Sequence, residues 1–213
     1  MLTRRAATAA LLALPAIGLP SFALAQDTVS VAELAEPGPL PEKALGDPKA
    51  KVTIIEYASM TCSHCARFHK DTFPALKAKY IDTGKVYFIL REFPLDPRAT
   101  AGFMLARCAG DDKYFPMVDV LFAQQPAWAF VEGNKVLEAM GQLAKQAGFT
   151  QQQFEACLQD QKLYDGINTI KARAAEKFGV NSTPTFFING KRAGGEMTIE
   201  ALDGLIAPLL GNG

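Results

Sequence analysis

A pair of closely spaced cysteines, Cys62 and Cys65, follows an apolar run and opens a stretch with helical spacing. The run, Val52–Tyr57, is rich in β-branched residues and nearly continuous in apolar character, as in a strand covered on both faces. Where such a strand leads into a helix, unpaired backbone N–H groups and the helix dipole favour an anion. The spacing therefore predicts an α/β fold that holds the Cys62 sulfur as a thiolate.

The two sulfurs of this motif are expected to play different parts. Cys62 is predicted to be the exposed, attacking thiol, whereas Cys65 lies one helical turn inward and is the covered, resolving thiol. His64, when protonated, places a positive charge beside Cys62 and lowers the pKa of that thiol further. A stabilised thiolate makes the disulfide form the better oxidant. We therefore expect a redox-active Cys62–Cys65 disulfide and no other cofactor.

An acidic residue, Glu56, interrupts the apolar strand six residues before Cys62. A buried carboxylate at that place is suited to accept the proton of Cys65 during thiol–disulfide exchange. The alternative is an acid paired with a structural lysine, or one at a hydrated strand end. We favour the proton-transfer role.

A proline precedes the third predicted strand, in the pair Thr183–Pro184. A proline just before a strand in this order of elements is a candidate for a cis peptide bond. Such a bond would present the Thr183 backbone to an extended substrate segment beside the sulfurs. The alternative is a trans proline that only begins the strand.

Four features together resemble the DsbA type of secreted thiol:disulfide oxidoreductase: Glu56, the motif Cys62-Ser63-His64-Cys65, a helical insertion and the segment that begins Thr183–Pro184. The resemblance covers roughly residues 44–210. It implies a thioredoxin-like fold with an inserted all-helical subdomain, and the nucleophile, resolving thiol, buried acid and cis-proline at Cys62, Cys65, Glu56 and Pro184. It also implies that reduced or unfolded exported proteins are the substrates, bound by Ser63, Thr183 and Pro184. A membrane quinone-linked oxidase is the implied partner that restores the disulfide.

Two positions depart from the best-known member of that family. Ser63 stands where that member has proline, and Thr183 stands where it has valine. Threonine before the cis-proline is also typical of related isomerases, which carry an added dimerisation domain. The 20 or so residues before Gly46 are too short for such a domain, so a monomeric oxidase is favoured over an isomerase or a reductase.

The chain ahead of the first strand divides into an export signal and a leader. Arg4 and Arg5, an apolar run over 6–19 and the Ala23–Ala25 end predict a signal peptide over residues 1–25, cleaved after Ala25. We favour ordinary Sec export over the twin-arginine route, and a periplasmic location. Disulfides persist in that compartment. Residues 26–45, with several prolines, are expected to form a flexible leader.

The remaining chain is expected to form a thioredoxin-like domain over 46–94 and 181–213, interrupted by a helical insertion over 95–180. The pattern predicts a helix from Ser63 to about Lys79 with a kink at Pro74, and a strand over 85–91. Four or five helices fit the insertion, with one beginning at a capping box on Thr150 and a loop around Pro126. A hairpin turn at Asn189–Gly190 and a final helix capped by Thr198 complete the chain.

The charge balance argues against a phosphate backbone as ligand. Lysine plus arginine and aspartate plus glutamate number 22 each in the full chain, and removal of the signal peptide leaves 20 basic residues against 22 acidic ones. A chain without excess positive charge has no electrostatic basis for binding nucleic acid.

A second cysteine pair, Cys108 and Cys157, lies in the predicted helical insertion. In an exported protein an even remainder of cysteines favours a structural disulfide, here closing a loop of about 50 residues. The alternative is two separate buried thiols.

Metal binding is the rival chemistry, because Cys62, Cys65 and His69 fall on or near one helical face. Zinc usually takes a fourth ligand, and the chain has only two histidines and one C-x-x-C. We therefore expect no metal site, with a copper- or peptide-binding module as a minor alternative, and we expect His69 at the surface. The aromatic residues of the insertion are expected in its core rather than in a groove for unfolded substrates: Phe115, Phe122, Trp128 and Phe130.

Overall fold

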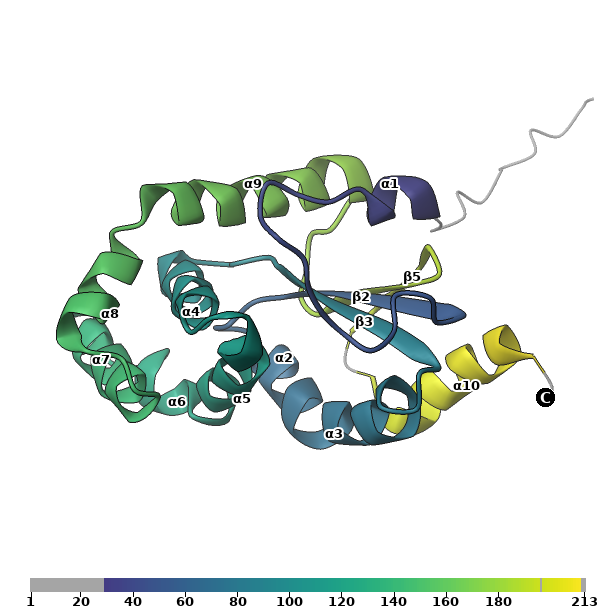
Figure 1. Ribbon diagram of the computed structural model, residues 1–213, viewed down its shortest axis with the longest axis horizontal. Coiled ribbons are helices and arrows are strands. Elements are labelled where there is room, and N and C mark those ends of the chain that lie inside the picture. The colour runs from purple at the N-terminus through teal and green to yellow at the C-terminus, as the bar shows by residue number, and fades with distance from the viewer. Residues whose placement is uncertain (1–28, 196, 212–213) are drawn as a thin grey trace, which may run out of the picture.

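A mixed five-stranded sheet forms the centre of the molecule (Figure 1). The computed structural model describes residues 29–195 and 197–211, so the predicted signal peptide lies outside the described residues. The strands are β1 (Lys43–Leu45), β2 (Val52–Ala58), β3 (Val86–Glu92), β4 (Thr185–Ile188) and β5 (Lys191–Gly194), in the spatial order β1-β3-β2-β4-β5. Strands β2 and β3 pair in parallel, and the other pairs are antiparallel.

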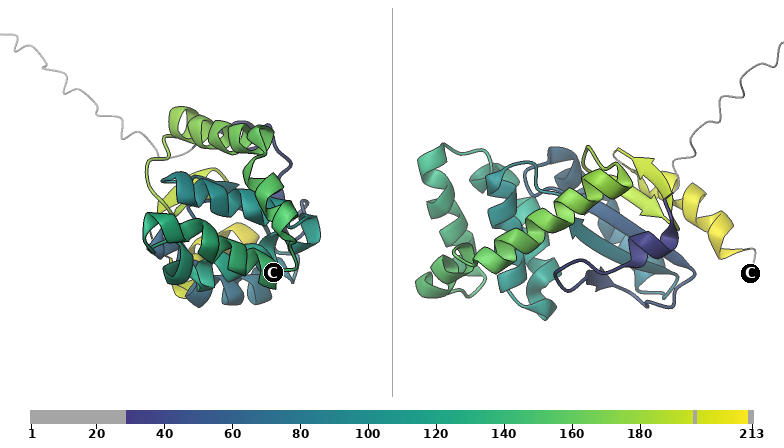
Figure 2. Two further views of the ribbon diagram at one scale, coloured as in Figure 1. Left: turned by 90° about the vertical axis from the view of Figure 1, so that its left-hand side faces the viewer. Right: turned by 90° about the horizontal axis from the view of Figure 1, so that it is seen from above.

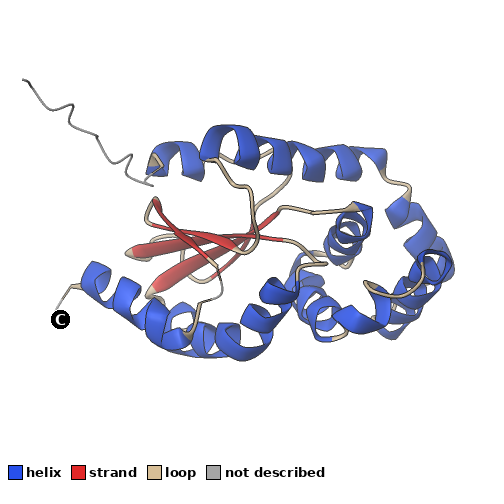
Figure 3. Ribbon diagram, turned by 180° about the vertical axis from the view of Figure 1, so that it is seen from behind, coloured by secondary structure: helices blue, strands red, loops and turns tan. Residues whose placement is uncertain are grey.

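Strand β2 is central and carries its side chains alternately to two covered faces, as the continuous apolar run predicts. Val52, Ile54 and Ala58 belong to the larger core cluster, together with residues of α3 (Phe73–Leu76) and α10 (Ile199–Leu210). Ile55 and Tyr57 belong to a second cluster with residues of α1 (Val31–Ala35) and α9 (Gln161–Phe178). The sheet is therefore sandwiched between two helical layers (Figure 3).

The helix that follows the cysteine motif runs over 63–81 and is not regular. It consists of α2 (Ser63–Arg67), a π-helical segment over Phe68–Thr72, α3, and a second π-helical segment over Lys77–Ile81. Pro74 lies in the first turn of α3, where proline is tolerated, and the irregularity of the helix begins before it, at Phe68.

The segment between β3 and β4 is helical, as predicted. Over residues 97–178, all of which the structure describes, six α-helices occur rather than four or five. They are α4 (Pro97–Cys108), α5 (Tyr114–Ala123), α6 (Gln125–Trp128), α7 (Val136–Gln146), α8 (Gln151–Leu158) and α9, with single 3₁₀ turns at Asp111–Lys113 and Gly133–Lys135. The difference is α6: the expected loop around Pro126 is a short helix, because proline is well tolerated in a first helical turn.

The last helix of this block, α9, leaves the other helices and runs back over the sheet (Figure 2). It packs against α4 at one place and β3 at another. Its residues Ile170, Ala174 and Phe178 are buried, and the last two join the core cluster beneath α1. One long helix thus fixes the helical block to the sheet.

The described part of the leader contains regular structure, which the sequence did not predict. The short helix α1 covers one sheet face, and β1 pairs antiparallel with β3 at the sheet edge. The prolines between these elements prevent a long helix but not these short ones. The predicted hairpin at Asn189–Gly190 and the Thr198 cap of α10 are confirmed. None of the helices within residues 29–195 and 197–211 has both the length and the apolar character needed to span a bilayer.

Candidate active site

Cys62 occupies the N-cap position of α2, with an extended backbone that ends the loop after β2. Its Sγ lies 3.2 Å from the carbonyl oxygen of Thr183, the residue that precedes β4. The predicted attacking thiol is less open than expected: Cys62 is only 8% exposed, because the Thr183 segment lies beside it. The sulfur therefore lies in a narrow opening between two loops.

Hydrogen bonds to the sulfur lower the pKa of Cys62 to about 5, from an ordinary value of 9.0. The largest contribution is the hydrogen bond from the side chain of Cys65, and burial opposes it. The backbone N–H groups of Cys65 and His64 lower the pKa further. These N–H groups are two of the unpaired donors of the first helical turn, as the position of the motif predicts.

Cys65 lies one turn inward and is fully buried. Burial is the main cause that raises the pKa of Cys65 well above its ordinary value, and the hydrogen bond to Cys62 and the negative charge of Glu56 add to it. Both thiols are free in this structure, which is the reduced form of the pair. The two sulfurs thus differ sharply in acidity: Cys62 is stable as a thiolate and Cys65 as a protonated donor.

The side chains of the two residues between the cysteines face outward. The His64 ring nitrogen Nδ1 lies 2.7 Å from the guanidinium of Arg67, which can only donate, so this nitrogen accepts the hydrogen bond. The backbone N–H of His64 is one of the causes of the lowered pKa of Cys62. Ser63 is exposed.

Glu56 is fully buried on β2, and its partner is a histidine rather than a lysine. Its Oε2 lies 2.9 Å from Nε2 of His69, whose side chain is 1% exposed. The prediction that His69 lies at the surface is therefore wrong. The reason is the π-helical segment at Phe68–Thr72, which turns His69 inward among aromatic rings. Across the described residues, no group of three His, Cys, Asp or Glu side chains is arranged to hold a metal ion.

The peptide bond between Thr183 and Pro184 is cis. Pro184 is buried, Thr183 is partly exposed, and the Thr183 carbonyl oxygen is directed to the Cys62 sulfur. The Thr183 hydroxyl is buried without a hydrogen-bond partner. A backbone segment with a polar group beside the sulfur is thus present where the sequence predicts substrate contact.

The helical block supplies two contacts to the cysteine loop that sequence reasoning missed. The Gln125 side chain, buried on α6, donates to the carbonyl oxygens of Met60 at 2.8 Å and Cys62 at 3.1 Å. Asp96, the N-cap of α4, accepts a hydrogen bond of 2.6 Å from the Thr61 hydroxyl. A cap residue such as Asp96 is detectable in the sequence, but its second partner and the role of Gln125 depend on the tertiary fold.

Comparisons with known proteins agree with this arrangement. A family model described as thioredoxin matches residues 40–207. The chain is 36% identical to alpha-DsbA1 of Wolbachia pipientis, and its structure aligns with that crystal structure with a TM-score of 0.77, covering 85% of this chain and 96% of the other. This chain belongs to the DsbA-type thiol:disulfide oxidoreductases of the thioredoxin superfamily.

Two further relatives set the extent of the likeness. A Rickettsia bellii protein, provisionally named a protein-disulfide oxidoreductase, is 37% identical over 152 residues, which are 70% of this chain and 57% of the relative. The chain thus spans little more than half the length of that curated relative. BdbD of Bacillus subtilis aligns with a TM-score of 0.70 at 21% identity, over 80% of this chain and 94% of the other, and shares the fold.

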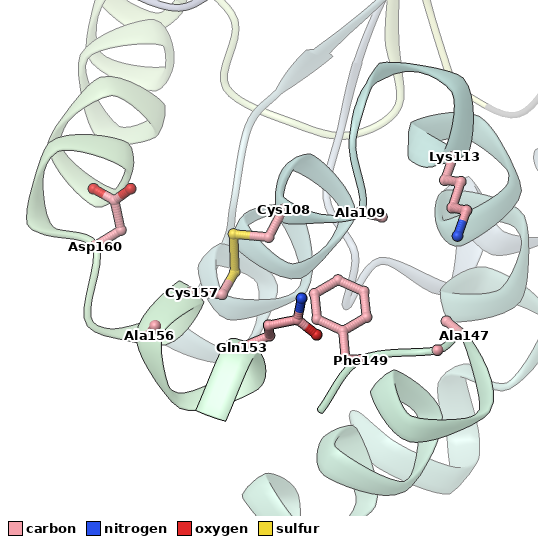
Figure 4. A pocket seen from close by; sticks show the side chains of 10 residues that line it. Cys108, Ala109, Lys113, Ala147, Phe149, Gln153, Ala156, Cys157 and Asp160 are labelled. Carbon is pink, nitrogen blue, oxygen red and sulfur yellow. A yellow bond between two sulfur atoms is a disulfide. The ribbon is translucent and has the colours of Figure 1, made fainter. Parts of the chain in front are cut away.

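Away from the motif, the DsbA-type chain contains one disulfide, between Cys108 at the end of α4 and Cys157 of α8. Their Cα atoms are 6.1 Å apart, and their sequence separation is 49. Figure 4 shows the disulfide at the wall of a cavity of about 420 Å³, with Phe149 and Gln153 beside it. This bond ties the first helix of the block to a late one.

The aromatic residues of the block divide into two groups. Phe115, Phe122 and Trp128 are buried, which confirms the core assignment for these three. Phe130 is 58% exposed, so its assignment to the core is wrong. It follows α6 in a loop whose neighbouring carbonyls, at 129 and 131, accept hydrogen bonds from Arg98 of α4. An exposed ring is therefore held near the N-terminus of α4, where Asp96 contacts the cysteine loop.

Proposed function

We propose that this chain is a periplasmic thiol:disulfide oxidoreductase that introduces disulfide bonds into exported proteins. The observation that carries the proposal is the contrast between the two sulfurs: a pKa of about 5 at Cys62 and a strongly raised pKa at the buried Cys65. Such a pair exchanges its disulfide through the outer sulfur and retains a proton on the inner one. Sequence relatives named for protein-disulfide oxidoreduction support the assignment.

In the reaction, a substrate thiolate attacks the Cys62 sulfur of the oxidised pair. The Cys62–Cys65 bond breaks, and its electron pair stays on Cys65, which takes up a proton with Glu56 as the proton-transfer group. A second substrate thiolate then attacks the substrate sulfur in the mixed disulfide and releases Cys62 as a thiolate. The substrate loses two electrons and the protein gains them, so the redox-active disulfide is the only cofactor that the reaction needs.

The low pKa of Cys62 favours the oxidising direction. At pH 7, only the part of this pKa shift that lies below pH 7 counts, which is about two pKa units. This stabilisation of the reduced form raises the two-electron reduction potential by about 60 mV. The neighbouring Thr183 carbonyl is suited to hold an extended substrate segment, with Pro184 beneath it and Ser63 at the rim. We propose that a membrane quinone-linked oxidase restores the disulfide and that the protein acts as a monomer after signal-peptide removal.

Equilibration of the purified mature protein with glutathione buffers tests the direction. We expect a potential well above that of cytosolic reductants, which lie at about −270 mV. We also expect Cys62→Ser to abolish oxidation of a reduced protein substrate, whereas Gln142→Ala, at an exposed position of α7, retains it. A potential at or below the cytosolic value would assign a reductase instead, and unimpaired exchange by Cys62→Ser would reject the assignment to this site.

A further inference from the structure

A buried imidazole joins the active-site carboxylate to the surface. The His69 ring lies between the rings of Phe73 and Phe122, with centroids 4.8 Å and 4.6 Å away and interplanar angles of 33° and 30°. These two tilted ring contacts restrict the orientation of the imidazole, so its two nitrogens point in defined directions. Nε2 lies 2.9 Å from Oε2 of Glu56.

The other nitrogen faces outward. His69 Nδ1 is buried and has no hydrogen-bond partner, and Oδ1 of Asp119 lies 3.9 Å from it. The Asp119 side chain, from α5, is 56% exposed. A hydrogen bond requires about 3.2 Å or less, so a movement of about 1 Å by this exposed carboxylate completes the contact. A cavity of about 340 Å³ is lined by both residues.

On the inner side, Glu56 has one carboxylate oxygen still available. Oε1 is buried and without a hydrogen-bond partner, whereas Oε2 faces His69. Glu56 carries its side chain to the same face of β2 as Ile54 and Ala58, and Cys65 belongs to the core cluster on that face. The negative charge of Glu56 acts on Cys65, since it is one of the causes of the raised pKa of that thiol.

We propose that His69 and Asp119 extend the path of the Cys65 proton from Glu56 to solvent. The inference rests on the proposed function, because it gives a route to a proton that the exchange reaction has to move. His69 acts through Glu56 and is a positioning and relay residue. Asp119 is the outer end of the path.

Each transfer on this path balances. When Cys65 attacks the mixed disulfide between Cys62 and a partner, its Sγ–H proton passes to the Glu56 carboxylate, a bond forms between the two cysteine sulfurs, and the partner leaves as a thiolate. The imidazolium of His69 releases its Nδ1 proton toward Asp119 and solvent, so the buried pair gains no net charge. When the disulfide is reduced again, the same transfers run backwards and restore the starting protonation.

The charged groups around the His69 ring do not block the path from Glu56 to Asp119. Glu56 faces the ring from β2 and Asp119 faces it from α5. Lys70 and Lys77, from the helix that carries His69, line the same cavity, and Lys77 is paired with Asp82. The carboxylates of Glu56 and Asp119 therefore both favour the protonated ring. The contact between Glu56 and His69 determines that Nε2 points inward.

The test separates the two thiols with 5,5′-dithiobis-(2-nitrobenzoate) under single-turnover conditions. The first release of nitrothiobenzoate reports attack by Cys62, and the second reports attack by Cys65 on the mixed disulfide. We expect His69→Gln, which keeps a donor toward Glu56 but does not titrate, to slow the second release by about tenfold or more at pH 7. The first release should stay within about twofold of wild type.

The exposed end of the path gives a variant that does not depend on a buried substitution. Asp119→Asn should slow the second release about threefold or more and shift its pH profile, whereas Asp112→Asn, a matched exposed acid, should leave both releases unchanged. Equal slowing of both releases in His69→Gln would show a purely structural role and overturn the relay. A wild-type rate and pH profile in Asp119→Asn would overturn the path to solvent. If wild-type Cys62 itself reacts as an ordinary thiol, the proposed function fails instead.

Discussion

The side-chain amide of Gln125 donates a hydrogen bond of 3.1 Å to the main-chain carbonyl of Cys62. The same nitrogen donates to the carbonyl of Met60 at 2.8 Å, so one side chain of the helical block holds both ends of the loop before α2. The helical block therefore does more than pack against the sheet. It fixes the backbone that carries the reactive sulfur.

Replacement of Gln125 by leucine tests this attachment. Gln125→Leu leaves two buried carbonyl groups without their donor, and we expect the free energy of unfolding to fall by about 1–3 kcal/mol. Urea denaturation of the oxidised protein measures the change. Gln142→Leu, at an exposed glutamine of α7, is the control and should change the free energy by less than about 0.5 kcal/mol. Equal effects of the two substitutions would contradict a specific attachment.

The acidity of Cys62 is measurable directly. Thiolate absorbance at 240 nm in the reduced protein should titrate with a midpoint near pH 5, because hydrogen bonds from the Cys65 side chain and the first helical turn hold the sulfur as an anion. Below this midpoint, alkylation by iodoacetamide should slow about tenfold per pH unit. The step should be absent in Cys62→Ser. A midpoint of 8 or higher would remove the basis of the proposed chemistry.

Ionisation of Cys62 also links the stability of the reduced protein to pH. Its folded pKa of about 5 lies below the ordinary value of 9.0, so the thiolate stabilises the folded reduced form. This contribution is complete above about pH 9, declines as pH falls, and is lost below about pH 5. We therefore expect the free energy of unfolding, measured in guanidinium at pH 5 and pH 8, to change less with pH in the oxidised form than in the reduced form. Parallel pH dependence of the two forms would contradict this linkage.

Loss of the second disulfide should weaken the fold without altering the first thiol. The bond between Cys108 and Cys157 spans 49 positions, and removing it by a double alanine substitution should lower the free energy of unfolding by about 3–4 kcal/mol. We expect the alkylation rate of Cys62 to stay within about twofold of wild type. Unchanged thermal and denaturant midpoints would contradict a stabilising role.

The exposed ring of Phe130 is predicted to contact protein substrates. It is 58% exposed and is held by Arg98 near the loop that carries Cys62, so Phe130→Ser should raise KM for a reduced protein substrate about threefold or more. The rate with a small dithiol should not change. Leu137→Ser removes an equally exposed apolar side chain (60%) from α7 and serves as the control. An equal change in KM for both variants would argue against a localised contact.

Much of the fold and the centre of the site follow from local sequence patterns. A β-branched run followed by Cys62 and a helical pattern defines the strand, the N-cap position and the inner place of Cys65, since these depend on backbone geometry over a few residues. The hairpin at Asn189–Gly190 is local in the same way. Each of these features depends on neighbours in the chain and is therefore visible in the sequence.

The partners that complete the site come from distant segments. As a polar residue in a predicted helix, His69 is expected at the surface. Its contact with Glu56 depends on the π-helical turn and on packing against Phe122 of α5. The contacts of Gln125 with the cysteine loop and the position of Phe130 depend on where the helical block docks. Burial and hydrogen bonding across 60 or more residues are set by the whole packing arrangement, and no short sequence pattern encodes them.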